Sequence, residues 1–324
     1  MAVRVGVIGV GIHGMHHVRL LSQMEDAELV GFYDSNAVES DNRANDYNTR
    51  SYSSIDEIIA DVDCVTVAVP TSAHYEVVMA CFSKGKHVLV EKPIASSVEE
   101  ADKMIAEADK QGLILAVGHI ERYNPAYRAL AGIDTKPVFV ESHRLAVFNP
   151  RGTDVAVVLD LMIHDIDIVL DMVRRPIISV NAVGVSVVTN EADIANARLE
   201  FEGGCVANLT ASRISQKQMR KCRTFQKNAY ISMDFLSGES EIFSLSNTAR
   251  PSALPGTVPQ LMEGISYKKI PNDGLNALEL ELHDFICSVR EGAQPKVTGR
   301  DGRNALEIAS RVMESIDASM RRIE

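Results

Sequence analysis

Short hydrophobic runs alternate with amphipathic stretches along the first third of the chain. The runs predict buried strands at 3–9, 28–34, 62–70, 86–92 and 113–119. The stretches between them have helical spacing, at 12–24, about 38–46, 74–84 and 97–111. Because the runs are hydrophobic along their whole length, both faces of their sheet should be covered by helices. The pattern predicts an α/β domain with a doubly wound parallel sheet over residues 1–120.

The pattern changes after residue 120. A short helix at 125–131 and a strand at 137–147 lead into a helical block at 153–173. Runs that alternate hydrophobic and polar residues follow without helices between them, at 178–188, 194–204, 205–213, 221–226, 228–236 and 240–246. Such runs are typical of an antiparallel sheet with one open face. After a proline-rich loop at 247–260, two helices close the chain, at about 274–291 and 301–321. Residues 121–324 are therefore predicted to form an α+β domain with a large, mostly antiparallel open sheet.

Composition narrows the class of protein. The chain has 324 residues and a net charge of −11, which argues against a nucleic-acid-binding protein, because such proteins carry a basic surface. No hydrophobic run approaches the roughly 20 residues that cross a membrane. The opening MAVRVGVIGV predicts a strand and not a signal peptide. The five cysteines lack Cys-x-x-Cys or zinc-motif spacing, so we expect no metal site, and reduced thiols in a cytoplasmic protein.

A glycine-rich turn follows the first predicted strand. Gly9, Gly11 and Gly14 form a Gly-x-Gly-x-x-Gly pattern between that strand and the next helix. In this context the first glycine permits a tight turn, the second lets the backbone approach a pyrophosphate, and the third lets helix and strand pack closely. Asp34 ends the second strand, where a carboxylate that binds the ribose hydroxyls belongs. The pattern predicts a dinucleotide site and favours NAD over NADP.

Several polar residues lie at the carboxyl ends of the predicted strands, where doubly wound sheets bind their ligands. Lys92 ends its strand within the sequence Glu-Lys-Pro, and this position directs it toward the cofactor crevice. Pro70 ends another strand. The remaining candidates for contact with the cofactor are neighbours of these positions: Ile12, His13, Ser35, Thr71, His74 and Glu91.

A helix in the second domain carries another pair of candidates. Asp160 and His164 are four residues apart, so they lie on one helix face, one turn from each other. Their neighbours are mostly hydrophobic, and burying two polar groups there is costly unless they serve each other or a ligand. Together with Lys92, this pair indicates a catalytic group.

These motifs together resemble the Gfo/Idh/MocA oxidoreductases, and the resemblance covers nearly the whole chain. It lies in the glycine turn and in the following segments: EKP at 91–93, GHIERYNP at 118–125, DLMIH at 160–164, NAYISMD at 228–234 and LHDFICSVREGAQPKVTGRDGRNALEIA at 282–309. Met162 departs from the pattern, because many members have glycine there. The resemblance implies NAD(P) on the first domain, a sugar substrate on the open sheet of the second, and Lys92, Asp160 and His164 as catalytic residues.

Physical reasoning agrees with these implied roles. When hydride leaves a sugar carbon, the hydroxyl proton must pass to a base, and an imidazole, with an ordinary pKa of about 6.5, suits that task. Lys92 would hold the same hydroxyl oxygen and oppose its developing charge, while Asp160 orients the base. Lys92 as the base is the alternative.

The segment VGHIERYNPAYRAL is most similar to the subgroup of UDP-N-acetylglucosamine 3-dehydrogenases. That similarity implies a 3-keto nucleotide sugar as product and an aminotransferase as pathway partner. We expect cations and donors near the domain junction to bind the substrate together with His164, namely His119, Arg122, Tyr123, Asn124, Arg144, Arg151 and Arg213.

Three other functions and the state of assembly stay open. The alternatives are an inositol or free-sugar dehydrogenase, a UDP-sugar uronate 3-dehydrogenase, and a non-enzymatic nucleotide-sensing regulator. A regulator can dispense with Lys92 and His164, so their presence together favours an enzyme. Because an open sheet face is usually covered, we expect a homodimer or homotetramer.

Overall fold

A computed structural model describes residues 2–47, 49–149, 155–245 and 265–321 of the chain. The chain divides into two compact units, one of residues 1–120 with 276–307 and one of residues 121–275 with 308–324. Residues 276–307, which the sequence analysis assigned to the second domain, therefore pack with the first. The proline-rich loop expected at 247–260 and the candidate Arg151 lie outside the described residues.

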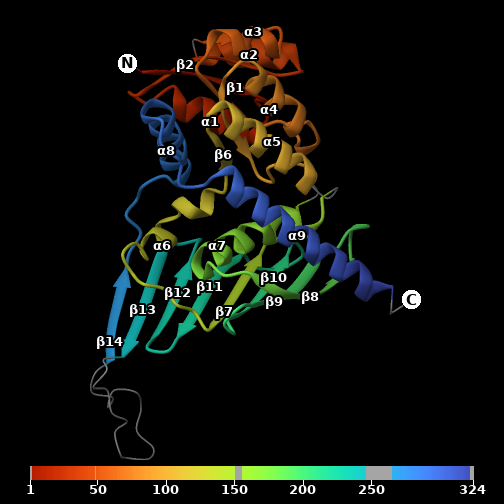
Figure 1. Cartoon of the computed structure of the whole chain (residues 1–324), viewed down its shortest axis with the longest axis vertical. Helices are drawn as coiled ribbons and strands as arrows, with labels where there is room; N and C mark the ends of the chain where they lie inside the picture. The colour runs from red at the N-terminus through yellow and green to blue at the C-terminus, as the bar shows by residue number, and fades with distance from the viewer. Residues whose placement is uncertain (1, 48, 150–154, 246–264, 322–324) are drawn as a thin grey trace, which may run out of the picture. The chain divides into compact units, whose positions relative to one another are not determined.

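The described residues of the first unit form a parallel sheet, as predicted, although it has six strands and the short strand at 50–51 was not expected (Figure 1). Its strands in chain order are β1 (Val3–Ile8), β2 (Ala27–Tyr33), β3 (Arg50–Ser51), β4 (Cys64–Val67), β5 (His87–Glu91) and β6 (Leu115–Gly118). In space the order is β3-β2-β1-β4-β5-β6. The direction of winding thus reverses between β1 and β4, and ligands of such sheets bind at that reversal.

Helices connect these strands. They are α1 (Ile12–Leu21), α2 (Ala37–Asp46), α3 (Ile55–Asp61), the short η1 (Thr71–Ala73), α4 (His74–Ser83) and α5 (Val98–Gln111). Local chemistry sets their ends: Ser97, for example, caps α5 by accepting a hydrogen bond from the Glu100 amide, and Gly112 ends that helix with φ of +67°. A further helix, α8 (Ala277–Glu291), joins the same unit, because Leu282, Phe285 and Ile286 enter the core that α1 and β1 share.

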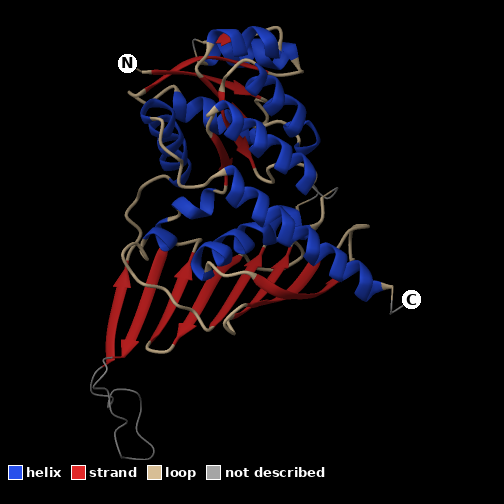
Figure 2. Cartoon of the chain, in the orientation of Figure 1, coloured by secondary structure: helices blue, strands red, loops and turns tan. Residues whose placement is uncertain are grey.

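The second unit is built on an eight-stranded sheet (Figure 2). Its described strands are β7 (Phe139–Leu145), β8 (Ile177–Val185), β9 (Ile194–Phe201), β10 (Val206–Ser212), β11 (Met219–Gln226), β12 (Ala229–Asp234), β13 (Glu239–Leu245) and β14 (Ile265–Ile270). The order is β14-β13-β12-β11-β7-β10-β9-β8, and all pairs are antiparallel except β7 with β10. The predicted α+β class with a mostly antiparallel sheet is confirmed.

One face of this sheet is covered by helices and the other is open. The short η2 (Ile120–Tyr123) and α6 (Pro125–Arg128) precede the sheet in the chain, and α7 (Ile163–Val173) lies across one face (Figure 1). The last part of α9 (Gly299–Met320) packs on β8, where the Ser315 hydroxyl accepts a hydrogen bond from the Ala182 amide at 2.8 Å. Within the described residues, Figure 1 shows no helix on the opposite face.

The helical block predicted at 153–173 differs from the structure at its start. The chain first forms a π-helical turn, η3 (Val158–Met162), and continues as α7. Single π turns inside helices occur frequently at functional sites. Hydrophobic periodicity did not reveal this turn, because residues four apart share a face in either kind of helix.

Two further findings concern membrane-spanning helices and the cysteines. No helix among the described residues is long and hydrophobic enough to cross a membrane. All five cysteines are free thiols, and four of them are buried.

Candidate functional site

The glycine turn after β1 has the geometry that the sequence predicts. Gly9 has φ of +89°, and a Cβ atom there would lie 2.8 Å from the backbone of Ala68. A Cβ atom on Gly14 would approach the Gly9 carbonyl oxygen to 1.9 Å. Around Gly11, in contrast, nothing lies within 4 Å of such an atom. The turn is therefore closed toward the protein and open at Gly11, where a pyrophosphate can approach.

Helix α1 begins directly after this turn. The N-cap residue is Gly11, which has no side chain to accept hydrogen bonds from the first backbone amides of the helix. The first turn of the helix also contains no acidic residue. These amides and the helix dipole suit an anion such as a phosphate. The predicted contacts Ile12 and His13 are both exposed beside this end of the helix.

Asp34 is tied to the same turn. One of its carboxylate oxygens, Oδ2, accepts a hydrogen bond from the Val10 amide at 2.7 Å, and the other accepts one from the Asn36 amide at 2.9 Å. Each oxygen keeps a further lone pair for a ribose hydroxyl. The carboxylate is half-buried, and the next residue, Ser35, is exposed. The donor and acceptor set of this unit thus fits the nucleotide half of NAD.

The end of β5 is braced by a residue that the sequence analysis did not select. His17, on α1, is 2% exposed, and its Nε2 lies 3.1 Å from Oε1 of Glu91. Burial, the largest single effect, acts to raise the pKa of Glu91, but the hydrogen bond with His17 and the electrostatic interactions with His17, His13 and Lys92 together outweigh it and lower that pKa. The second carboxylate oxygen of Glu91 accepts the Lys92 amide at 3.2 Å. Glu91 therefore fixes the backbone from which the Lys92 side chain departs.

His74 holds the next residue along this segment. Its Nδ1 lies 2.9 Å from the Pro93 carbonyl oxygen, and its Nε2 lies 3.0 Å from that of Val69. The side chain is only 1% exposed, and burial lowers its pKa despite these two carbonyls. His74 was predicted to contact the cofactor. In the structure its two ring nitrogens instead contact carbonyl groups of the segments that follow β4 and β5, and so connect these segments. The neighbouring candidates Pro70 and Thr71 remain accessible.

In the second unit, the two candidates Asp160 and His164 are half-buried. Asp160 lies in the π turn η3, and His164 lies in the first turn of α7. The neighbouring acids Asp165 and Asp167 are buried, 3% and 1% exposed. The helix therefore presents Asp160 and His164 on a partly accessible side and two carboxylates to the protein interior.

The buried acids of α7 bind two buried arginines. Arg144 donates from Nε to Asp165 Oδ2 at 2.7 Å and from Nη1 to Glu121 Oε1 at 2.7 Å. Arg122 donates from Nε to Asp167 Oδ2 at 2.7 Å and from Nη2 to Oδ1 at 2.9 Å. Bidentate pairs of this kind fix position and orientation. Together they hold the helix that carries His164.

This arrangement corrects the prediction that Arg122 and Arg144 bind the substrate. Both side chains are at most 4% exposed, and their guanidinium groups are neutralised by carboxylates of their own unit. Arg122 also pairs with Asp171 at 2.8 Å. Both arginines therefore have a structural role in supporting α7.

The other polar candidates of this region are also engaged inside the protein. Asn124 caps α6 through Oδ1, which accepts the Ala126 amide at 3.0 Å, while its Nδ2 donates to Glu121 and to the Phe235 carbonyl. The remaining three are buried, namely His119, Tyr123 and Arg213. Their predicted contact with substrate is not supported by this burial.

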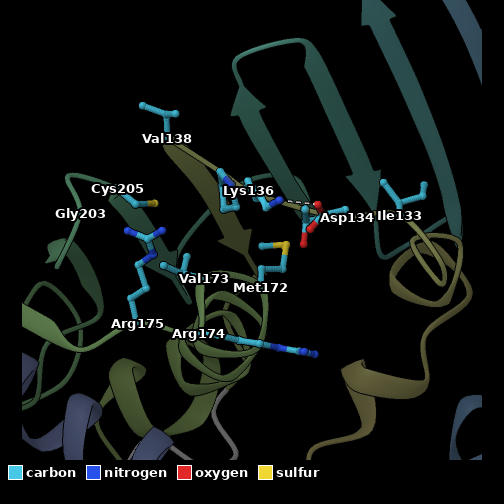
Figure 3. Close-up of a pocket in the computed structure, with 12 residues that line it drawn as sticks. Ile133, Asp134, Lys136, Val138, Met172, Val173, Arg174, Arg175, Gly203 and Cys205 are labelled. Carbon is cyan, nitrogen blue, oxygen red and sulfur yellow. Dashed lines mark ion pairs between the residues drawn. The ribbon is translucent and has the colours of Figure 1, made fainter.

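A separate cavity of about 450 Å³ lies in the second unit between the start of β7 and the end of α7. Arg175 turns toward Cys205 and Gly203 in this cavity, whereas Arg174 points away (Figure 3). Lys136 pairs with Asp134 at 2.6 Å, and Arg174 pairs with Asp171 at 3.1 Å. Most of the positive charge around the cavity is therefore neutralised, and no residue predicted from the sequence lines it.

Two family models match the chain. Residues 3–119 match "Oxidoreductase family, NAD-binding Rossmann fold", and residues 140–231 match "GFO/IDH/MocA C-terminal domain". Both matches agree with the two sheets described above.

Individual proteins match along nearly the whole chain. The UDP-N-acetylglucosamine 3-dehydrogenase of Acidithiobacillus ferrooxidans is 36% identical over 321 residues, which cover 98% of this chain and 99% of that protein. Its solved structure superposes with a TM-score of 0.89 at 34% identity, over 98% and 99% of the two chains. The myo-inositol 2-dehydrogenase of Thermotoga maritima is 26% identical, over 97% of this chain and 96% of its own. A levoglucosan dehydrogenase solved with NADH shares the fold, with a TM-score of 0.83 at 19% identity over 98% of each chain.

Proposed function

The chain belongs to the Gfo/Idh/MocA oxidoreductase family, and from that premise we propose that it oxidises the C3 hydroxyl of UDP-N-acetylglucosamine to a ketone. It is an NAD-dependent sugar dehydrogenase, since its family binds NAD and its similar relatives are named dehydrogenases. The observation that carries the substrate is the 36% identity, along 98% of the chain, with a protein of that activity. The lower identity of 26% to an inositol dehydrogenase makes inositol or a free sugar the second candidate.

We assign the chemistry to Lys92, Asp160 and His164. NAD, held by the glycine turn and Asp34, would supply the hydride acceptor. His164 takes the proton of the substrate hydroxyl as the carbonyl forms, and Lys92 donates a hydrogen bond to the same oxygen and opposes its growing negative charge. Asp160 orients the imidazole. Lys92 is the alternative proton acceptor.

Rigid supports around these residues favour the assignment. Glu91, held by His17, fixes the backbone at Lys92. The two buried arginines described above fix the helix that carries His164. Groups that act on a transition state need such support, because a displacement of about 0.5 Å already weakens their contribution.

An assay with UDP-N-acetylglucosamine, NAD and a carbonyl trap tests the substrate. We expect loss of two hydrogens from the sugar by mass spectrometry, with a 3-keto product. Free N-acetylglucosamine should lose turnover as well as affinity, because the UDP group supplies binding energy that holds C3 in place. A purified aminotransferase that acts on keto nucleotide sugars replaces the trap in a second arm, since we propose such an enzyme as the consumer of the product. Rapid NADH formation from inositol, with no keto nucleotide sugar in either arm, would transfer the assignment to the second candidate.

We further propose that the open face of the second sheet joins two copies of the chain. An aromatic row crosses this face on five adjacent strands, and its members are Phe139, Phe225, Tyr230, Phe243 and Tyr267. Neighbouring ring centroids are 4.6 to 5.7 Å apart. Tyr267 is 51% exposed and Phe243 is 37% exposed, so the row presents apolar area to solvent. A flat apolar sheet face of this kind is usually covered by a partner.

Replacing Phe243 by lysine places a charge in the middle of the aromatic row. We expect multi-angle light scattering to give the mass of a dimer or tetramer for the unmodified protein and the mass of a monomer for Phe243→Lys. The control is Lys110→Glu, a charge change at an exposed position on α5 in the first unit. A monomer for the unmodified protein, or an unchanged oligomer for Phe243→Lys, contradicts the proposed interface.

A further inference from the structure

Three metal-ligating side chains meet on the first unit. His283 and Cys287 lie one turn apart on α8, and Asp26 directly precedes β2. Oδ2 of Asp26 lies 3.5 Å from Nε2 of His283 and 3.9 Å from Sγ of Cys287. Sγ of Cys287 lies 3.7 Å from the same imidazole nitrogen. One nitrogen, one sulfur and one oxygen thus form a compact triangle.

The triangle has nearly the size of a zinc coordination face. Zinc binds nitrogen and oxygen at about 2.0 Å and sulfur at about 2.3 Å in a tetrahedron. Those bonds place the nitrogen and oxygen ligands about 3.3 Å apart, and the sulfur about 3.5 Å from either. The three separations in the protein, 3.5, 3.7 and 3.9 Å, exceed these edges by only a few tenths of an ångström. Small side-chain movements would close the site around a metal.

We propose that Asp26, His283 and Cys287 form a binding site for a zinc-class divalent cation. An imidazole and a thiolate select zinc or cobalt over magnesium and calcium, which prefer oxygen ligands. Three protein ligands leave one tetrahedral position for water, and the 57% exposure of the His283 side chain leaves the site open to solvent. The charges balance, since a thiolate and a carboxylate neutralise a divalent ion.

The guanidinium of Arg290 lies beside two of the three ligand side chains. Its Nη2 lies 3.1 Å from Sγ of Cys287, and its Nη1 lies 3.6 Å from Oδ2 of Asp26. The guanidinium also pairs with Glu291 at 3.2 Å, and the side chain is 39% exposed. An incoming cation therefore displaces Arg290 toward Glu291 and solvent. Arg290 competes with the metal and lowers its affinity.

The position of the site indicates a structural role. Asp26 lies before the first residue of β2, whereas Asp34 lies after its last residue, so the metal site and the cofactor turn are at opposite ends of that strand. Asp26 and Cys287 are 261 residues apart in the chain. A bound metal would link α8 to the residue that precedes β2. Because a ligand that binds only the folded protein stabilises the folded state by mass action, the metal should raise the stability of this unit. This inference is independent of the proposed substrate.

Cobalt titration of the full-length protein, stripped of metal with a chelator, tests the site. We expect one equivalent of Co²⁺ to give a thiolate-to-cobalt charge-transfer band and a tetrahedral visible spectrum, both abolished by Zn²⁺. Cys287→Ser should remove the charge-transfer band, and Asp26→Asn should weaken binding at least about tenfold, the lower limit for losing even a supporting partner of a metal site. Arg290→Gln should tighten binding, because it removes the competing charge.

Controls separate a built site from an accidental one. Cys205→Ser should leave the cobalt spectrum unchanged, because Cys205 is a buried thiol of the second unit. Zn²⁺ should raise the melting temperature of the unmodified protein and of Arg290→Gln, but not that of Cys287→Ser. Circular dichroism verifies that each variant is folded. Equal metal affinity for the unmodified protein and Cys287→Ser, or no charge-transfer band in either the unmodified protein or Arg290→Gln, would mean adventitious binding only and would overturn the proposal.

Discussion

Replacing His164 by alanine should lower kcat for the sugar substrate at least about a hundredfold, the lower range for loss of a positioned acid–base group. Lys92→Ala should have an effect of similar size, because it removes the group that opposes the charge on the same oxygen. The double variant should be little worse than either single one, since groups that act in one proton transfer are not additive. Steady-state kinetics of all three variants measures these effects.

Two further measurements make this expectation specific. NADH binding, followed by fluorescence, should survive in His164→Ala, because the glycine turn and Asp34 are unchanged. The matched control is His143→Ala, which alters a half-buried histidine on β7 in the same unit. Near-normal turnover by His164→Ala would show that the imidazole is not the proton acceptor and would leave Lys92 in that role.

Arg144→Leu should lower the free energy of unfolding by about 3–5 kcal/mol, the usual cost of breaking a buried ion pair by removing one partner. The cost is large because Asp165 and Glu121, both buried, would each lose a charged donor at 2.7 Å. The midpoint of urea unfolding measures this change. Because Arg144 also supports α7, any folded Arg144→Leu protein should turn over more slowly.

An exposed pair in the same unit serves as the control. Arg198 contacts Glu200 at 3.1 Å, and both side chains are well exposed, 47% and 39%. Arg198→Leu should change stability by less than about 1 kcal/mol, since solvent screens such pairs. Arg144→Lys restores the charge without the bidentate geometry and should fall between the two. Equal stability of Arg144→Leu and Arg198→Leu would refute a supporting role for the buried pair.

Local patterns predicted the parts of the structure that local chemistry determines. The glycine turn, Asp34 at the end of β2 and the doubly wound order follow from strand and helix spacing together with the backbone freedom of Gly9. Lys92 at a strand end was placed in the same way. The open sheet of the second unit was predictable from alternating residues alone.

The misassigned residues depend on partners that are distant in sequence. From the sequence alone, Arg122 and Arg144 resemble phosphate ligands. Their carboxylate partners on α7 are 45 and 21 residues away in the chain, so local patterns do not reveal them. His17 was not selected from the sequence because Glu91, which it binds, is 74 residues away. Cys287 lacks a zinc motif, since the nearest oxygen ligand is 261 residues earlier in the chain. Sequence spacing reports only ligands that lie close together along the chain.

The membership of residues 276–307 in the first unit has a consequence for the order in which the protein is made. Leu282, Phe285 and Ile286 fill the same core as Val5 and Leu21, yet the ribosome synthesises them after every described strand of the two sheets. The nascent chain therefore carries an incomplete hydrophobic core through most of translation, when exposed apolar surface is prone to association. The cofactor-binding unit includes the first residues to be synthesised, yet its hydrophobic core can be completed only near the end of translation.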